Sequence, residues 1–211
     1  MQRFNKANFT LFCDKLARKD PGLKGILKQY GYPPMWTRPA TFQTLILIIL
    51  EQQVSLASAY AAFKKLREKT GYVTPAKILA LTDKEMRAVY FTRQKMGYAR
   101  ELARAIQSRK LVLKKLGSLK DEEVREQLIQ LKGIGHWTID VYLMHALQRT
   151  DLFPLGDIAL VNSLKHIKEL PPHTTKDELL AIAEPWRPHR TIAAMMLWHA
   201  YIKRKGIILK E

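Results

Sequence analysis

The stretch that decides the fold lies between two apolar helical stripes and reads Leu131-Lys132-Gly133-Ile134-Gly135-His136-Trp137-Thr138. Two glycines two residues apart let the chain reverse tightly and bring bare backbone N–H groups toward a ligand. The start of the following helix adds further N–H groups and the positive end of its dipole, which suit a phosphate. An ordinary turn between helices explains the same glycines, and no strand precedes them as a dinucleotide-binding fingerprint requires. The stretch alone predicts a helical hairpin and leaves its ligand open.

Outward from this hairpin, nearly every periodic segment has helical spacing. Ser118 is the expected cap of the preceding helix, whose apolar stripe is Val124, Leu128 and Leu131. Capping-box spacing marks two more helix starts, at Thr82 with Glu85 and at Thr175 with Glu178. Other helices are expected at about 41–50, 55–69, 93–109, 137–148, 157–168, 175–186 and 188–203. We find no strand period and no internal repeat, so the predicted class is all-α. The prolines from Pro33 to Pro39 predict a linker after an N-terminal helical segment.

Composition points to a polyanionic partner. Lys and Arg number 36 against 19 Asp and Glu, which gives a formal net charge of +17. Such a surface attracts nucleic acid, because neutralised phosphates release counterions. The single cysteine, Cys13, excludes an internal disulfide and a cysteine-ligated zinc or iron–sulfur site. The first residues lack the apolar stretch of a secretory signal, and the longest apolar runs are far too short to span a bilayer. We therefore expect a soluble intracellular protein of the cytoplasm or nucleoid, or of the nucleus in a eukaryote, without membrane contact.

A second stretch follows the hairpin helix and reads Phe153-Pro154-Leu155-Gly156-Asp157 before helical spacing resumes. Aspartate is favoured as a helix N-cap, and that role alone explains Asp157. The other interpretation is a carboxylate held at a helix start, facing a reacting centre that develops positive charge. The residues of this stretch leave both interpretations open.

Taken together, the two stretches resemble the helix–hairpin–helix DNA glycosylase superfamily, and within it the AlkA-type 3-methyladenine glycosylases. Ile49-Leu50-Glu51-Gln52-Gln53-Val54-Ser55 is similar to the glutamine-containing segment that fills the gap left by an extruded nucleotide. The stretch from Trp186 to Ala194, continued to Trp198, resembles the closing helix that walls the base pocket. The resemblance runs from about Asp20 to Tyr201 in ordered blocks.

This resemblance implies an all-α fold of two helical lobes with a DNA-binding cleft between them. The first lobe would comprise residues 36–150, with the helix–hairpin–helix at about 128–148. The second would combine residues 1–35 with 151–211. The implied activity is a DNA repair hydrolase that flips out alkylated purines of the 3-methyladenine class and cleaves their N-glycosyl bond in double-stranded DNA. Asp157 would be the catalytic carboxylate that stabilises an oxocarbenium-like sugar.

Further site residues follow from the same resemblance. The base pocket would be lined by Trp137, Trp198, Tyr142 and His199, the DNA wedge would be Gln53 with Gln52 beside it, and phosphate would bind at Lys132, Gly133, Gly135, His136 and Thr138. Burial in the core is the alternative explanation for the tryptophans and the favoured one for Tyr142, and a solvated step between helices is the alternative for the glutamines. No cofactor and no catalytic metal are implied. A structural Na⁺ or K⁺ would sit on the backbone carbonyls of Ile129, Leu131 and Ile134. We expect a monomer.

Trp137 stands where bifunctional glycosylase/lyases of this superfamily carry their Schiff-base lysine. Because tryptophan cannot be that nucleophile, we expect a monofunctional enzyme that leaves the abasic strand uncut. Two departures put the base preference in doubt: Val141 replaces a frequent aromatic, and His199 replaces a second pocket aromatic. The alternatives are a superfamily glycosylase for oxidised or deaminated bases, and a non-catalytic DNA-binding module that uses the hairpin for phosphate alone.

Overall fold

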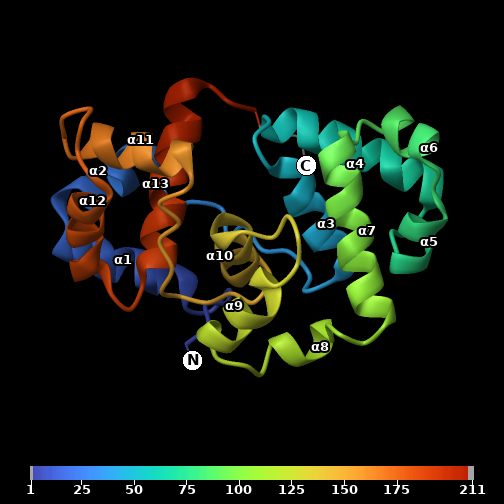
Figure 1. Ribbon diagram of the computed structural model, residues 1–211. Coiled ribbons are helices and arrows are strands. Elements are labelled where there is room, and N and C mark those ends of the chain that lie inside the picture. The colour runs from blue at the N-terminus through green and yellow to red at the C-terminus, as the bar shows by residue number, and fades with distance from the viewer. Residues whose placement is uncertain (1, 209–211) are drawn as a thin grey trace. The chain divides into compact units, whose positions relative to one another are not determined.

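A computed structural model describes residues 2–208 of the chain, and within them every regular element is a helix (Figure 1). The only β pairing in this part is an isolated antiparallel bridge between Arg3 and Arg149. The all-α prediction is confirmed. The helices divide into two compact units. The first holds the residues up to Thr37 together with Leu143–Ile208, and the second holds Arg38–Tyr142. The predicted lobes divided the chain at 35/36 and 150/151 instead.

The first unit is built around one buried helix, α13 (Arg190–Lys205). It packs against α1 (Phe9–Lys19), α2 (Pro21–Tyr30) and α11 (Ile158–Ile167), as the red, blue and orange ribbons of Figure 1 show. Every residue from Thr191 to Leu197 is buried, as expected of a helix covered on all sides. α12 (Lys176–Ala183) and the short 3-10 helix η1 (Glu184–Trp186) complete the unit.

Asp20 fastens three elements of this first unit. It caps α2 by accepting the backbone N–H groups of Gly22 and Leu23, with Pro21 at the first helical position. Its carboxylate also accepts Lys168 Nζ at 2.7 Å and Trp186 Nε1 at 2.8 Å. Burial raises the pKa of the Asp20 carboxyl, but the hydrogen bonds from Lys168 and Trp186 outweigh it and bring the pKa below its ordinary value. The Asp20 carboxyl group is therefore ionised in the folded protein at neutral pH.

The second unit has α3 (Phe42–Glu51) at its centre, and eight of the ten residues of this helix are buried. α3 packs against α4 (Leu56–Thr70) and α7 (Arg93–Gln107), and α7 in turn packs against α5 (Pro75–Ala80) and α6 (Asp83–Ala88). The chain then forms α8 (Leu113–Leu116), α9 (Asp121–Ile129) and α10 (His136–His145), the last of which ends among the residues of the first unit.

The prediction of Ser118 as the cap of the helix before the hairpin is wrong. The Ser118 hydroxyl donates to Lys115 O at 2.8 Å and so closes the turn after α8. α9 starts three residues later, where the Lys120 N–H donates to Glu123 Oε2 at 2.7 Å. A glutamate at the third helical position thus marks this start without a hydroxyl cap.

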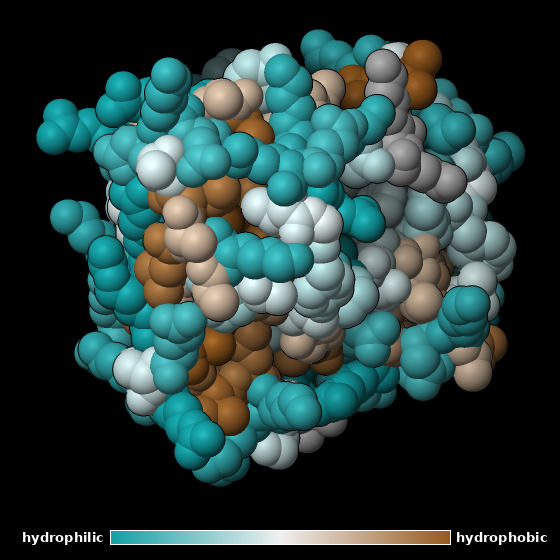
Figure 2. Space-filling view, turned by 90° about the vertical axis from the view of Figure 1, so that its right-hand side faces the viewer, coloured by the Kyte–Doolittle hydropathy of each residue, from teal (hydrophilic) through white to brown (hydrophobic). Residues whose placement is uncertain are grey.

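Other helix boundaries agree more closely with the sequence. Both predicted capping boxes, Thr82 with Glu85 and Thr175 with Glu178, are confirmed. α10 ends at His145, earlier than the predicted 148, and Gln148 has a φ of 57° that no helix continues through. None of the helices in residues 2–208 is long and apolar enough to cross a membrane. Hydrophilic side chains cover most of the face in Figure 2, with apolar patches between them.

Candidate functional site

Asp157 is the N-cap residue of α11, so the interpretation of Asp157 as a helix cap is confirmed. Its Oδ1 accepts the Leu160 N–H at 2.9 Å, and its own N–H donates to Pro154 O at 2.9 Å. The same Oδ1 accepts the indole Nε1–H of Trp198 at 3.0 Å. Two donors and the positive end of a helix dipole therefore stabilise a negative charge here and fix the direction of the carboxylate.

Trp198 connects this carboxylate to a second ring, the imidazole of His145. It is half-buried on α13, and its indole stacks on the imidazole of His145, with centroids 5.6 Å apart and planes inclined by 24°. His145 Nδ1 lies 2.8 Å from Trp36 O. Because a carbonyl oxygen only accepts, Nδ1 carries a proton. Asp157, Trp198 and His145 thus form a continuous carboxylate–indole–imidazole group in the first unit. Sequence reasoning missed His145, since its contacts are made with residues far away in the chain.

The other predicted pocket residues lie deeper or elsewhere. His199 is only 5% exposed, and its Nε2 lies 3.0 Å from Tyr30 O, which leaves little surface for a base. Tyr142 is fully buried in the second unit, and burial raises the pKa of its hydroxyl to about 12. Trp137 is half-buried at the second residue of α10. The pocket roles of these three residues stay predictions.

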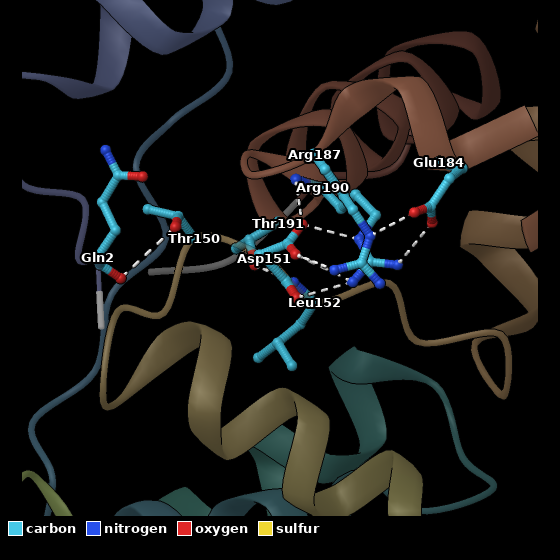
Figure 3. Close-up of polar contacts among 8 residues, drawn as sticks. All are labelled: Gln2, Thr150, Asp151, Leu152, Glu184, Arg187, Arg190 and Thr191. Atoms are coloured by element: carbon cyan, nitrogen blue, oxygen red, sulfur yellow. Dashed lines mark hydrogen bonds and ion pairs between the residues drawn. The ribbon is translucent and has the colours of Figure 1, made fainter. Parts of the chain in front are cut away.

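The loop that leads to Asp157 is attached to the start of α13 by an ion-pair network (Figure 3). Asp151 accepts Arg190 Nε at 2.8 Å and Arg187 NH1 at 3.0 Å. Glu184 pairs with both arginines, at 2.7 Å from Arg187 Nε and 3.7 Å from Arg190 NH1. Arg190 is the least exposed of these residues, so the Arg190–Asp151 pair is shielded from solvent more than a surface ion pair is.

Backbone contacts flank this network on both sides of Asp151. The Thr191 N–H donates to Thr150 O at 2.9 Å, and its hydroxyl accepts the Leu152 N–H at 3.1 Å (Figure 3). Farther along, Ser163 of α11 donates its hydroxyl to Leu197 O of α13 at 2.6 Å. α13 therefore positions the loop before Asp157, the helix after it and, through Trp198, the carboxylate itself.

The hairpin in the second unit joins α9 to α10, and its two glycines have different reasons to be there. Gly133 has a φ of 88°, and a Cβ at this position would lie 2.0 Å from Tyr98 Cγ, so only glycine fits. Gly135 lies outside the left-handed region, and a Cβ added to it would meet no atom within 4 Å, which leaves open space beside its backbone. Lys132, Gly135 and His136 are exposed, so this side of the hairpin is accessible to a phosphate.

The two predicted wedge glutamines are not equivalent. Gln52 donates its side-chain Nε2 to Gly133 O at 2.8 Å and to Thr138 Oγ1 at 2.9 Å. Gln53 is exposed and has a φ of 56°. Thr138 is only 2% exposed, so its hydroxyl faces Gln52 inside the unit. The structure thus brings Gln52 to the hairpin and leaves Gln53 projecting, while phosphate binding by Thr138 stays a prediction.

The hairpin also carries the carbonyls predicted to hold a monovalent cation. Ile129 is the last residue of α9, where carbonyls lack partners within the helix and the dipole is negative. Leu131 O already accepts the Ile134 N–H at 3.0 Å, and a carbonyl has a second lone pair. An all-oxygen donor set of this kind fits Na⁺ or K⁺. Within residues 2–208, no group of three or more His, Cys, Asp or Glu could hold a metal ion.

Comparisons with known proteins agree with these features. A family model described as HhH-GPD superfamily base excision DNA repair protein matches residues 46–188. A putative DNA-3-methyladenine glycosylase of Bacillus subtilis, YfjP, is 30% identical over 84% of this chain, which spans 65% of that relative. DNA-3-methyladenine glycosylase 1 of Schizosaccharomyces pombe is 30% identical over 87% of this chain and 83% of its own length.

Solved structures point the same way. A structure of Schizosaccharomyces pombe 3-methyladenine DNA glycosylase in complex with abasic DNA superposes with a TM-score of 0.84 and 28% identity, covering 95% of this chain and 99% of that one. A DNA-3-methyladenine glycosidase from Bacillus halodurans superposes with a TM-score of 0.75 and 25% identity, covering 98% and 95%.

Proposed function

The chain belongs to the HhH-GPD superfamily of base excision DNA repair proteins, and from that premise we propose that it is a monofunctional N-glycosylase for alkylated purines of the 3-methyladenine class. The relatives named as 3-methyladenine glycosylases support this substrate class. The observation that carries the proposal is Asp157, an aspartate whose Oδ1 is held by Trp198 at the start of a helix. Double-stranded DNA is the proposed partner, met in the cytoplasm, nucleoid or nucleus.

The chemistry needed is modest, because alkylation gives the purine a positive charge. Breaking the N-glycosyl bond sends its electron pair to the base nitrogen, so the base leaves neutral and the positive charge moves to the sugar. The Asp157 carboxylate would stabilise that charge, and it needs no reorientation because Trp198 and the Leu160 N–H already hold it. Water adds to the sugar carbon and loses its proton, which completes hydrolysis. Stabilisation of this kind is worth about 10²–10³ in rate.

The ring pair beside the carboxylate suits the same leaving group. Trp198 offers an electron-rich face, and a cationic base over such a face gains about 0.5–2 kcal/mol. His145 stacks on the indole, so the ring is held by this contact as well as by its hydrogen bond to Asp157. The tryptophan thus has two proposed roles, in base recognition and in orientation of Asp157.

The hairpin would hold the DNA backbone without taking part in the chemistry. Exposed backbone at Gly135 and the N-terminal end of α10 offer N–H groups to a phosphate, and Lys132 adds a positive charge. A Na⁺ or K⁺ on the carbonyls of Ile129, Leu131 and Ile134 would supply a further positive charge. Trp137 cannot form a Schiff base, so the strand would be left intact at the abasic site.

Release of free base tests the proposal. The intact protein should release alkylated purine from a methylated duplex, and strand breaks should appear only after hot alkali. A panel of duplexes with oxidised or deaminated bases measures the preference directly. Asp157→Asn should bind the same duplex and lose release by at least about 100-fold. Excision of an oxidised or deaminated base instead would reassign the substrate. Tight, salt-sensitive binding with no release from any duplex would contradict the enzyme assignment.

A further inference from the structure

We propose that Gln52 is a positioning residue that ties the DNA-inserting turn at Gln53 to the phosphate-binding hairpin. This inference rests on the proposed function, because it gives the turn and the hairpin their DNA-binding roles. Gln52 and Gly133 are 81 residues apart in the chain, and the side chain of Gln52 joins the two segments. Both belong to the second unit.

The contact is a forked one. The single Nε2 group of Gln52 donates one hydrogen to Gly133 O at 2.8 Å and the other to Thr138 Oγ1 at 2.9 Å. One acceptor lies in the hairpin turn and the other in the first turn of α10, on opposite sides of Gly135 along the chain. Gln52 therefore fixes both ends of the segment whose backbone faces a phosphate.

Gln52 cannot serve as the wedge while it makes this contact. Moving its amide into DNA would break both hydrogen bonds and leave the buried Thr138 hydroxyl without its donor, which is costly inside a protein. Gln53 has no such constraint, since its side chain is exposed. Gln53 lies in the turn after α3, and its φ of 56° is a conformation that a non-glycine residue adopts when its neighbours are held.

The residues before the tip are indeed held. Lys95, itself buried, donates its Nζ to Leu50 O at 2.6 Å at the end of α3. Arg38 binds the Glu51 carboxylate through two nitrogens, at 2.8 and 2.6 Å. Together with Gln52, three consecutive residues are anchored immediately before Gln53. The arrangement presents Gln53 at a fixed place relative to the hairpin, so the turn need not be ordered when DNA binds.

The test uses a duplex that carries a tetrahydrofuran abasic analogue beside 2-aminopurine, whose fluorescence reports the filling of the gap. Gln52→Met keeps the length of the side chain and removes its donor. We expect about tenfold weaker affinity for this duplex and loss of most of the fluorescence change, while affinity for undamaged duplex, which charge dominates, changes less than about twofold. Thr138→Val removes one of the two acceptors and should weaken lesion affinity by about threefold.

Two controls separate positioning from general stability. Thr82→Ala removes the N-cap side chain of α6, elsewhere in the same unit, without changing the charge of the protein. It should lower thermal stability and leave lesion affinity unchanged. In a Gln53→Ala background, Gln52→Met should cost less than about twofold in the fluorescence signal, because its effect passes through Gln53.

The inference is overturned by wild-type lesion affinity and fluorescence in Gln52→Met. It is also overturned if Thr82→Ala weakens lesion affinity as much, or if the Gln52→Met effect persists in full without Gln53. Failure of the proposed function has a different signature: the wild-type protein would bind the abasic analogue and release no base from any damaged duplex.

Discussion

Asp157 and the hairpin glycines are held in place by different means. In the first unit the group proposed to act in catalysis is a side chain, and other side chains orient it: Trp198 donates to its Oδ1, and the Arg190–Asp151 pair holds the loop before it. In the second unit the groups proposed to bind DNA are backbone atoms, and the shape of the turn orients them around Gly133 and Gly135. A carboxylate can be abolished by one isosteric change, whereas backbone donors are lost only when the chain geometry changes or when a new side chain blocks the approach to them.

Because of this difference, we expect substitutions in the two regions to affect different steps. Changes near Asp157 should alter turnover more than binding, because Trp198 binds the proposed catalytic carboxylate. Changes in the hairpin should alter folding or DNA affinity and leave the chemical step alone.

The hairpin glycines give the sharpest contrast in stability. Gly133→Ala should lower the free energy of unfolding by about 3 kcal/mol, because the new Cβ meets the Tyr98 ring and the backbone angle is strained. Gly135→Ala, with open space around it, should change the same free energy by less than about 0.5 kcal/mol. Urea unfolding measures both. Equal destabilisation by the two variants would show that the glycines are not distinguished as the structure has them.

Substitution of Asp20 tests how the C-terminal end of α11 is held, because Lys168, which follows the last turn of this helix, forms an ion pair with Asp20. Asp20→Asn should destabilise the protein by about 2 kcal/mol at neutral pH, because it removes a partly buried ion-pair partner. The folded-state pKa of Asp20 lies below its ordinary value of 3.8. Its contribution is therefore fully present above that ordinary value and is lost as the pH falls through the folded-state pKa.

Urea unfolding of wild type and Asp20→Asn from about pH 7 downward checks this sign. The difference between the two proteins should stay constant to about the ordinary aspartate pKa and then shrink in more acidic solution. A difference that grows toward acid would mean that burial, and not the bonds from Lys168 and Trp186, controls the pKa of this carboxyl.

Trp198→Phe tests the orientation of Asp157 with a smaller effect. The substitution keeps an aromatic ring and removes the indole N–H that binds Oδ1. Loss of one hydrogen bond to a charged group corresponds to about tenfold slower excision under single-turnover conditions. Affinity for an abasic-analogue duplex should change less than about threefold. A variant that binds about tenfold more weakly but excises bound substrate at the wild-type rate would place Trp198 in binding alone.

Local sequence patterns predicted the local parts of this structure. The N-cap role of Asp157 and both capping boxes depend on residues three positions apart, and all are confirmed. The Ser118 prediction was wrong for a local reason too: the carboxylate of Glu123, inside the first turn of α9, accepts the Lys120 N–H and marks the start of this helix without a hydroxyl cap. The hairpin was visible because two glycines at this spacing signal a chain reversal.

The remaining parts of the site could not be read from the sequence. His145 meets Trp36 across 109 positions and stacks on Trp198, and Arg190 meets Asp151 across 39. Gln52 and Gln53 are identical in type and adjacent, and only the folded structure distinguishes them: Gln52 contacts Gly133 and Thr138, whereas Gln53 is exposed. Such pairings arise from the packing of whole helices, and no periodicity or motif in a single sequence reports them.

The most direct test of the central claim measures base release and DNA affinity in one variant at Asp157 and one in the hairpin. Single-turnover base release from saturating methylated duplex, together with affinity for the abasic-analogue duplex, should be determined for Asp157→Asn and Gly135→Ala. The account predicts opposite losses: Asp157→Asn binds as wild type and loses release by at least about 100-fold, while Gly135→Ala binds more weakly and releases base at the wild-type rate once bound. Wild-type release by Asp157→Asn, or equal loss of both quantities in both variants, would contradict it.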